Sequence, residues 1–443
     1  MQQSFDFFPE QARGHFAVMP QDEGQNNIVP LKPLRIAILG YRSHPFSGGQ
    51  GIYIKYLSKA LVDAGHQVDV ISGEPYPHLD ERVNLIKMPS MNLYERGLRS
   101  LRPHHLKSYA NIVEWFSKLT GGFAEPYAFG LRVNAYLRKH GHEYDLIHDN
   151  QSLCSGLLDI QKRLPLVTTV HHPVTSDRDI AVNASNKFWE RLLIRRWYSF
   201  LGMQIKVARK LQHIVTVSEC SRHDIAQSFG LDESDIHLIY CGIDTEEFVP
   251  RPHIQRRSLR LMATASADQP LKGLRYLLEA YANLLPEFPD LELLVVGKLN
   301  PAGATAKLLK ALDIEDRVQF VSGITTEQMV DYYAEATIAV VPSVYEGFGL
   351  PAGEAMACEV PLISTNGGAL PEVVGDAGIQ VPIKDSAAIA DAIRGLLNNA
   401  EKREALGKAG RERILQSFSW HAVANTLTQY YHGIINQIQA NKQ

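Results

Sequence analysis

The first regular pattern of hydrophobic residues in the chain is a short apolar run, Leu34–Gly40. It ends in glycine and is typical of a buried parallel strand. Residues 52–65 then place apolar side chains at helical spacing and stop at a glycine, and residues 67–72 form a second apolar run. This order predicts a strand, a helix and a second strand. That unit is the building block of a doubly wound parallel sheet.

The same alternation continues in two series. Further strands are expected at 145–148, 166–170, 214–217 and 236–240, and then at 259–265, 291–297, 318–321, 338–342 and 361–364. A turn-rich, proline-containing stretch lies between the two series. The pattern therefore predicts an α/β protein with two doubly wound, Rossmann-like domains that face a central cleft. The expected parts are a flexible N-terminal arm at 1–33, domains at 34–240 and 258–416, a linker at 241–257 and a last helix within 417–443.

Composition narrows the class of protein. The chain has 443 residues and a net charge of −3, which argues against nucleic acid as the main partner. Its four cysteines form no C-x-x-C pair and do not sit at zinc-ligand spacing, and a long chain with few cysteines fits a reducing compartment. The N-terminus lacks the pattern of a signal peptide, and no apolar run approaches the roughly 18–20 residues that span a bilayer. We therefore expect a cytoplasmic protein.

The segment Ser343–Ala357 is the most informative for chemistry. Its two carboxylates, Glu346 and Glu354, flank a glycine-rich loop that leads from an expected strand into an expected helix. Glycines let backbone amides approach a ligand, a helix N-terminus favours phosphate, and a carboxylate one turn on can accept hydrogen bonds from a sugar diol. The alternative is a tight loop before an ordinary amphipathic helix. The glycine-rich interior and the flanking elements favour a ligand site.

Two other loops offer groups for phosphate. The stretch Ser47–Gly51 places a glycine pair before a helix, too late after the strand for a dinucleotide fingerprint. Lys272 lies where a strand joins a helix of the second domain, and it could neutralise a leaving diphosphate. A lysine near a helix N-terminus is unfavourable for the helix dipole, which favours a ligand at that place. The alternatives are a flexible loop and a surface lysine.

Polar residues also close several expected strands. His171 and His172 follow the strand at 166–170, and imidazole can donate to a sugar hydroxyl or accept a proton. By residue type alone, a histidine at a strand end is more often structural. His148 and Asn150 end the neighbouring strand and, together with His172, are candidates for the acceptor side. The strand end at Ser322 is expected to take part in recognition of a base.

The segment from Glu346 to Glu354 resembles that of the retaining glycosyltransferases of family 4, and the resemblance extends from about residue 34 to 436. It implies the two-domain GT-B fold, in which the last helix crosses back to the first domain. It also implies that Glu354 holds the donor ribose hydroxyls and that Glu346 lies beside the donor sugar. The sugar and phosphates would then meet backbone amides at Gly347, Phe348, Gly349 and Leu350.

The resemblance assigns further roles. Gly49 would present its amide to the donor phosphate. His171 would contact the donor sugar, with His172 as the second choice. A turn at 365–372 resembles a glycine-rich stretch that borders the family's donor site. Many members carry an arginine five residues before the lysine that corresponds to Lys272, whereas this chain has Ala267 there. The diphosphate would then be held by Lys272, backbone amides and Ser266, or by another cation that the fold brings in.

The function that these residues predict is transfer of a sugar from a nucleoside diphosphate sugar to an acceptor hydroxyl. The resemblance implies retention of anomeric configuration by front-face displacement, with His171, Glu346 and Lys272 as the catalytic residues. We expect no metal, because no Asp-x-Asp cluster ends a strand, and no pyridoxal phosphate. The sugar, the base and the acceptor (a glycan, a lipid or a small molecule) stay open. The alternatives are an epimerase or phosphorylase of the same fold, and a non-catalytic regulator that binds nucleotide sugars.

The stretch 187–210 combines seven Lys and Arg with one Glu and several aromatic residues. A basic amphipathic helix of this kind can lie on an anionic membrane. The alternative is a long helix that packs its aromatic side on the sheet. Residues 94–140 hold a second basic and aromatic stretch, which could shape the acceptor pocket.

Overall fold

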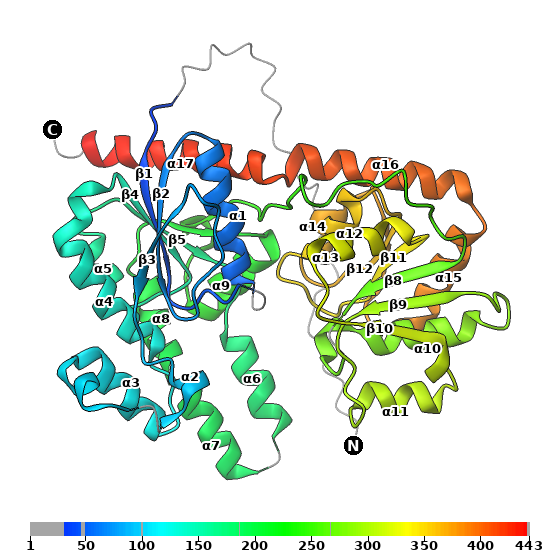
Figure 1. Ribbon diagram of the computed structural model, residues 1–443, viewed down its shortest axis with the longest axis horizontal. Helices are drawn as coiled ribbons and strands as arrows, with labels where there is room; N and C mark the ends of the chain where they lie inside the picture. Colours follow the sequence, from blue (N-terminus) through cyan, green and yellow to red (C-terminus); the bar gives the residue numbers. More distant parts are fainter. Residues whose placement is uncertain (1–30, 46–48, 99–100, 186, 266, 441–443) are drawn as a thin grey trace. The chain divides into compact units, whose positions relative to one another are not determined.

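The computed structural model describes residues 31–45, 49–98, 101–185, 187–265 and 267–440 (Figure 1). The helices and strands of these residues belong to one compact unit, Pro33–Gln443. The arm expected at 1–33 therefore lies almost entirely outside the described residues.

The first half of the chain forms a seven-stranded sheet in which all neighbouring strands are parallel. The strand order is β3-β2-β1-β4-β5-β6-β7. The strands are β1 (Arg35–Gly40), β2 (Gln67–Gly73), β3 (Asn84–Met88), β4 (Leu146–Asn150), β5 (Leu166–Val170), β6 (Ile214–Thr216) and β7 (Ile236–Leu238).

Helices connect and cover these strands (Figure 1). The α-helices of this half are α1 (Gln50–Asp63), α2 (Leu93–Arg96), α3 (Tyr109–Leu119), α4 (Glu125–His140), α5 (Leu157–Ile160), α6 (Thr175–Ala184), α7 (Phe188–Trp197), α8 (Leu201–Ala208) and α9 (Glu219–Phe229). Short 3₁₀ turns are η2 (Pro103–Lys107), η3 (Gly141–Glu143), η4 (Tyr198–Phe200) and η5 (Glu233–Asp235). Because all strands run in parallel, the loops that follow them gather at one edge of the sheet.

The second half repeats this plan with a six-stranded parallel sheet of order β10-β9-β8-β11-β12-β13. Its strands are β8 (Arg260–Thr264), β9 (Glu292–Val296), β10 (Val318–Val321), β11 (Ile338–Val341), β12 (Leu362–Thr365) and β13 (Ile379–Val381). Its helices are η6 (Pro270–Lys272), α10 (Leu274–Leu284), α11 (Ala304–Ala311), η7 (Glu315–Arg317), α12 (Thr326–Glu335), α13 (Leu350–Ala357), α14 (Leu370–Val374), α15 (Ser386–Leu397), α16 (Ala400–Ser417) and α17 (Trp420–Ala440).

The predicted α/β fold with two parallel sheets is confirmed, and most expected strands lie within one or two residues of their predicted bounds. The pattern missed β3 and β13, which are the outer strands of their sheets. Only one residue of β3 and one of β13 is buried, so neither strand forms the continuous apolar run that marks a buried strand. We call the first sheet with its helices the first lobe, and the second sheet with its helices the second lobe.

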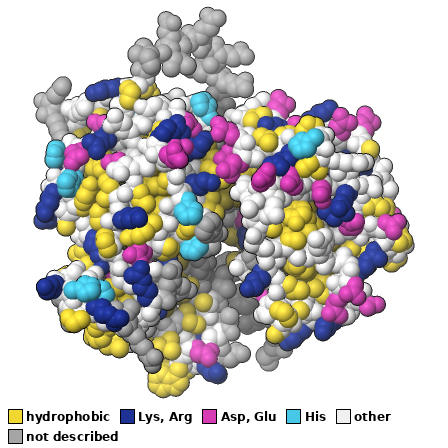
Figure 2. Space-filling view, viewed as in Figure 1, with side chains coloured by type: hydrophobic (Ala, Val, Ile, Leu, Met, Phe, Trp, Pro, Cys, Tyr) yellow, Lys and Arg dark blue, Asp and Glu magenta, His cyan; other side chains and the backbone are white. Residues whose placement is uncertain are grey.

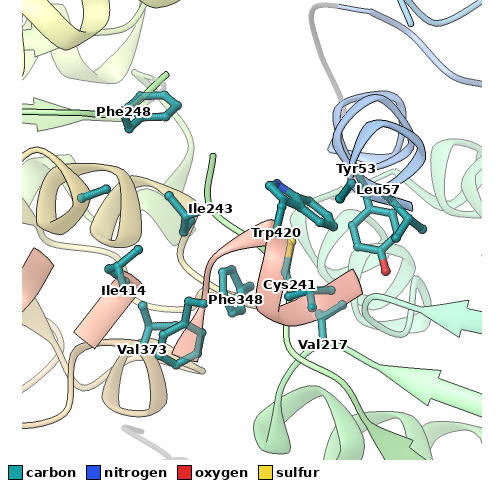
Figure 3. Close-up of a cluster of buried hydrophobic side chains, with 14 of the residues drawn as sticks. Tyr53, Leu57, Val217, Cys241, Ile243, Phe248, Phe348, Val373, Ile414 and Trp420 are labelled. Carbon is teal, nitrogen blue, oxygen red and sulfur yellow. The ribbon is translucent and has the colours of Figure 1, made fainter. Parts of the chain in front are cut away.

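A hydrophobic cluster joins the two lobes (Figure 3). Trp420, the first residue of α17, lies against the ring of Tyr53 on α1, with 5.3 Å between the ring centroids. The same indole covers Gly242, where a Cβ atom would approach the ring to 2.3 Å. Ile243 packs on Gly353 of α13. The segment that follows β7 thus runs through the cluster, between α17 on one side and α13 on the other.

The last helix, α17, belongs in space to the first lobe. It packs along α1, and the His66 imidazole lies 2.8 Å from the Thr428 hydroxyl. Tyr431, also on α17, bonds through its hydroxyl to the ring of His148 in the middle of β4. The first lobe is therefore completed by residues from the far end of the sequence.

Candidate functional site

Three loops of the second lobe converge at the carboxyl ends of β8, β11 and β12. The Val344 amide donates to the Leu271 carbonyl at 2.8 Å, and the Ala369 amide donates to the Glu346 carbonyl at 2.8 Å. A Cβ on Gly273 would come within 1.9 Å of a carbonyl oxygen after β11, and one on Gly368 within 2.2 Å of the Glu346 carbonyl oxygen. Both glycines have positive φ, so these close approaches depend on glycine.

Glu346 lies at the centre of these loops. Its carboxylate accepts from the Lys272 ammonium at 2.8 Å and from the Ser343 hydroxyl at 2.7 Å. Glu346 is buried, and the Lys272 side chain keeps partial exposure. The structure thus brings together two predicted site residues that are 74 positions apart in the chain. The pair leaves a partly exposed cation at the carboxyl edge of the second sheet.

The helix α13 begins beside this ion pair. Gly349 is its N-cap, with φ 101°, a conformation that favours glycine. The Phe348 side chain is buried and lies near Phe418, with 5.9 Å between ring centroids. Leu350, the first residue of α13, packs against the same cluster. The side chains of Phe348 and Leu350 are therefore used in packing.

Glu354 lies on α13, one turn beyond the glycine cap. The Tyr333 hydroxyl of α12 donates to its carboxylate at 3.4 Å and also reaches the Pro351 carbonyl. Burial raises the pKa of Glu354 to about 7, against a smaller lowering by the Tyr333 hydrogen bond. Its charge therefore changes near neutral pH.

His171 follows β5 on the first lobe and is held by two side chains from the end of β4. Its ring Nε2 lies 2.7 Å from the Asn150 amide oxygen, while the Asn150 amide nitrogen donates to the Gln50 carbonyl. The Gln151 amide oxygen accepts from the His171 backbone N–H at 2.7 Å. Because Asn150 presents an acceptor, Nε2 carries the proton and Nδ1 is the acceptor nitrogen. Burial lowers the pKa of His171 to about 3, so the ring is neutral at physiological pH.

The loop after β4 that supplies these side chains has an unusual backbone. Gln151 and Leu153 have φ values of 52° and 45°, which few residues other than glycine adopt. The buried Asp149 carboxylate fixes the turn by accepting from the amides of Ser152 and Leu153. Strained backbone of this kind gathers at functional sites. Gln151 and Asp149 are positioning residues, a role that the sequence pattern does not predict.

Gly49 is the N-cap of α1, next to the Gln50 carbonyl that Asn150 binds. It has φ 40°, and nothing lies within 4 Å of the point that a Cβ would occupy. The side of Gly49 on which a side chain would lie is thus open, at the N-terminus of α1. The other glycine of the pair lies outside the described residues.

His148 was expected on the acceptor side, and this expectation is wrong. The side chain has 0% exposure, and its ring nitrogens bond to the hydroxyls of Tyr431 and Thr169. Burial lowers the pKa of His148 to about 3, which keeps it neutral. It is a structural histidine that joins α17 to the first sheet. Asn150 is also buried and acts on His171 rather than facing an acceptor.

The second lobe contacts the first through the loop that carries Glu346. The Gly347 carbonyl accepts from the hydroxyls of Ser218 and Ser221 at the start of α9, at 2.7 and 3.1 Å. A Cβ on Gly347 would lie 3.9 Å from the His171 carbonyl oxygen and 4.0 Å from the His172 Cβ. The predicted strand end and the predicted glycine loop are therefore adjacent across the two lobes.

Glu372, in the glycine-rich turn that was expected to border the site, also reaches α9. Its carboxylate accepts from the backbone amides of Glu219 and Cys220 at 2.7 and 2.8 Å. Tyr345 adds a third contact, because its hydroxyl donates to Asp224 at 2.6 Å. A serine before a helix, such as Ser218, is a recognisable N-cap in the sequence. No sequence pattern predicts the contacts that α9 makes with the second lobe.

The loop after β8 lacks the arginine that the family pattern leads one to expect. Asp268 has φ 63°, accepts from the Thr305 amide at 2.7 Å, and so caps α11. Ser266 lies outside the described residues. Ser322 is exposed just after β10, and no described contact joins it to Glu346 or Glu354.

The basic stretch 187–210 is not one long helix. It forms α7, a 3₁₀ turn and α8, and only α8 of the two helices has buried residues. The alternative in which the aromatic side of α7 packs on the sheet is therefore wrong. Phe188 and Trp189 are 70% and 72% exposed.

Comparison with known proteins agrees with this arrangement. The family model for Glycosyl transferases group 1 matches residues 250–413, and that for Glycosyltransferase Family 4 matches residues 47–247. The chain is 43% identical over 414 residues to an MMP alpha-(1->4)-mannosyltransferase of Mycolicibacterium hassiacum, covering 92% of this chain and 100% of the relative. It is 26% identical to a D-inositol 3-phosphate glycosyltransferase of Kribbella flavida, covering 90% of this chain and 96% of the relative.

Solved structures show the same fold. Sucrose-phosphate synthase from Thermosynechococcus elongatus has a TM-score of 0.67 at 25% identity, over 91% of this chain and 100% of that chain. HepE of Anabaena, in complex with UDP-glucose, has a TM-score of 0.62 at 16% identity, over 90% of this chain and 100% of that chain. At the latter identity the likeness concerns the fold alone.

Proposed function

The chain belongs to the group 1 glycosyltransferases, and on that premise we propose that it moves a hexosyl group from a nucleoside diphosphate sugar to a sugar hydroxyl with retention of configuration. The observation that carries this proposal is the Lys272–Glu346 pair beside the N-terminus of α13. A cation, backbone amides and a carboxylate meet there at one sheet edge. Such a set suits a substrate that carries both a diphosphate and a sugar.

In the proposed reaction, the bond between the sugar C1 and the diphosphate oxygen breaks, and the acceptor oxygen bonds to C1 on the same face. The acceptor proton passes to the leaving phosphate oxygen. Negative charge grows on the diphosphate as it leaves, and the Lys272 ammonium and the first amides of α13 stabilise it. Charge stabilisation by fixed groups removes the need for a metal or for pyridoxal phosphate in this proposal.

The remaining groups orient the donor. Glu354 is one turn along α13, where its carboxylate would accept from the ribose hydroxyls. Glu346 would bind the sugar, and Gly49, the N-cap of α1, would offer its backbone amide to the phosphate. His171 is neutral, so it would act as a hydrogen-bonding group rather than as an acid. Orientation of this kind is worth several powers of ten in rate.

We propose mannose as the sugar, because the relative at 43% identity is named as an α-(1→4)-mannosyltransferase. The base is a separate question. HepE is described in complex with UDP-glucose, but that protein shares only the fold with this chain. Ser322, exposed at the end of β10, is the proposed contact for the base.

The test is a panel of nucleoside diphosphate sugars incubated with mannosides and other saccharide acceptors. We expect transfer from a mannose donor, with an α-linked product when the donor is an α-anomer, as read from the anomeric proton signals by NMR. A β-linked product would refute retention. Release of free nucleotide at equal rates with and without every acceptor would refute transfer.

We also propose that the protein works in the cytoplasm and contacts the inner face of the membrane through residues 187–210. Within the described residues, no helix has the length and hydropathy needed to cross a bilayer. The exposed aromatic residues of α7 support a peripheral contact.

A further inference from the structure

Two helices of the first lobe expose their apolar faces. On α3, the apolar residues Tyr109, Ile112, Phe116 and Leu119 are exposed and recur at helical spacing. On α7, the exposed apolar residues are Phe188, Trp189, Leu192 and Leu193. Scattered exposed apolar residues are normal, but two stripes on neighbouring helices indicate an interaction surface. We call these eight residues the apolar stripes.

The two helices touch each other. Leu193 lies near Gly121, just beyond the end of α3, and Arg196 donates to the Thr120 hydroxyl at 2.7 Å. Phe123 stacks on Trp197 with 5.0 Å between ring centroids. The stripes therefore belong to one continuous part of the lobe, at the lower edge in Figures 1 and 2, where hydrophobic side chains lie beside Lys and Arg.

A cavity of about 410 Å³ opens between α3, α4 and α8. Its walls are mostly apolar and include Phe116, Tyr127 and Met203. Arg196 also lines the cavity, and its guanidinium bonds to the hydroxyls of Ser199 and Thr120. These partners are neutral, and within the described part of the chain no carboxylate pairs with Arg196. An apolar cavity with a cation beside it suits an apolar chain that carries an anionic head.

The charge around the stripes has one dominant sign. Residues 101–120 and 187–197 together contain seven Lys and Arg and two Glu. Glu114 is buried and paired with Arg132 at 2.6 Å, and Glu190 is paired with Lys187 at 3.1 Å. Exposed cations next to exposed apolar and aromatic side chains match the interface of an anionic bilayer, where tryptophan lies at the level of the headgroups.

We propose that α3 and α7 form a single docking surface for an anionic lipid bilayer, and that the cavity beside Arg196 receives one acyl chain. The surface lies on segments that follow β3 and β5, at the loop edge of the first sheet. Docking would therefore place the bilayer on the side of this lobe from which the loops of the site emerge. This inference rests on the membrane contact proposed above for residues 187–210, to which it adds α3 and the cavity, and it does not depend on sugar transfer.

The test uses the full chain in flotation assays with vesicles of phosphatidylcholine, alone or with about 30% phosphatidylglycerol, a content chosen to give a negative surface potential. We expect binding to the anionic vesicles and at least tenfold weaker binding to the neutral ones. Trp189→Glu and the double variant Arg191→Glu/Arg195→Glu should each weaken binding to the anionic vesicles at least tenfold. These residues are exposed, so the variants should keep the wild-type melting temperature and turnover with a small soluble acceptor.

A matched control is Leu415→Glu, which changes an exposed apolar residue of α16 on the other lobe and should bind as the wild type does.

Vesicles with brominated acyl chains test the cavity. Trp115 of α3 is also partly exposed, so this test uses the double variant Trp115→Phe/Trp189→Phe. In that protein, continued quenching of tryptophan fluorescence supports entry of a chain near Trp197, and loss of quenching refutes it. Absence of binding to anionic vesicles overturns the surface. So does a dimer without lipid that Trp189→Glu dissociates, because the stripes would then pack on a second copy.

Discussion

Glu354 combines two properties that oppose each other. To accept hydrogen bonds from the ribose hydroxyls, as proposed, its carboxylate must be charged. Its burial on α13 favours the neutral form. Burial raises its pKa to about 7, so the charge is lost as pH falls through neutrality. The affinity of the site for its donor therefore depends on pH within the physiological range.

We expect donor affinity to fall about tenfold between pH 8 and pH 6, because a carboxyl with a pKa near 7 is about nine-tenths ionised at the upper value and one-tenth at the lower. Titration calorimetry with the donor at both pH values measures this change. Glu354→Gln should bind weakly at both pH values, with the dependence removed. A wild-type affinity that stays level across this range would contradict the ribose assignment.

Lys272 should act mainly on turnover. Lys272→Gln keeps much of the side-chain length but removes the charge that stabilises the leaving diphosphate, so we expect kcat to fall about 100- to 1,000-fold. Lys307→Gln, an exposed lysine of α11 in the same lobe, is the control and should leave kcat unchanged. Steady-state kinetics with a melting-temperature check separates catalysis from folding. Near-normal turnover of Lys272→Gln would assign the diphosphate to another group.

At the residue scale, the sequence predicted the groups with strong chemistry but not their partners. Glu346 and Lys272 were found from their loops, and the structure places them 2.8 Å apart. Gln151 and Asp149 were missed as positioning residues, because an amide and a carboxylate beyond a strand have no pattern that reports a left-handed turn. His148 was misassigned, since its partner Tyr431 lies 283 positions away. Contacts between distant segments leave no periodic signal in the chain.

At the scale of elements, the donor side depends on how closely three loops pack. Gly368, with φ 63°, lies under the backbone of Glu346, and Gly273 lies under the loop that follows β11. The sequence predicted these strands because each is an apolar run. It could not predict the outer strands β3 and β13, whose residues are only partly buried. It also could not show that α7 has no buried face, since an amphipathic pattern does not reveal whether a partner is present.

Gly368→Ala should displace the loop that holds Glu346, because its Cβ would lie 2.2 Å from a backbone oxygen and the residue has positive φ. We expect at least a tenfold loss of kcat/KM and a loss of stability of about 1–3 kcal/mol. Gly395→Ala, in α15, has open space at the Cβ position and should stabilise the protein by about 0.5–1 kcal/mol. Denaturant unfolding and kinetics of both variants make the comparison. Equal behaviour of the two would contradict the packing argument.

At the scale of the whole molecule, α9 of the first lobe holds the site loops of the second. Ser218 and Ser221 bind the Gly347 carbonyl, and Glu372 accepts from the amides at the start of α9. These contacts lie beside the place where the donor sugar would meet His171. They can therefore couple closure of the two lobes to the position of the loop that carries Gly347. Closure in turn limits the access of water to the donor.

Glu372→Ala removes both hydrogen bonds to α9 and should loosen this closure. We expect a lower transfer rate and a several-fold higher ratio of donor hydrolysis to transfer, because water then reaches the donor more often. Product analysis by NMR gives the ratio. Glu412→Ala, an exposed glutamate on α16, should keep the wild-type ratio. An unchanged ratio in Glu372→Ala would show that closure does not depend on α9.

The return of α17 to the first lobe has a consequence for the order in which the protein folds. A ribosome completes β1 and α1 early, but Trp420, Thr428 and Tyr431 leave it hundreds of residues later. Until then Tyr53, His66 and His148 have no partners from α17, and the surface of α1 that this helix covers faces solvent. The first lobe thus lacks α17 during most of synthesis. In this incomplete state its exposed apolar surface favours chaperone binding.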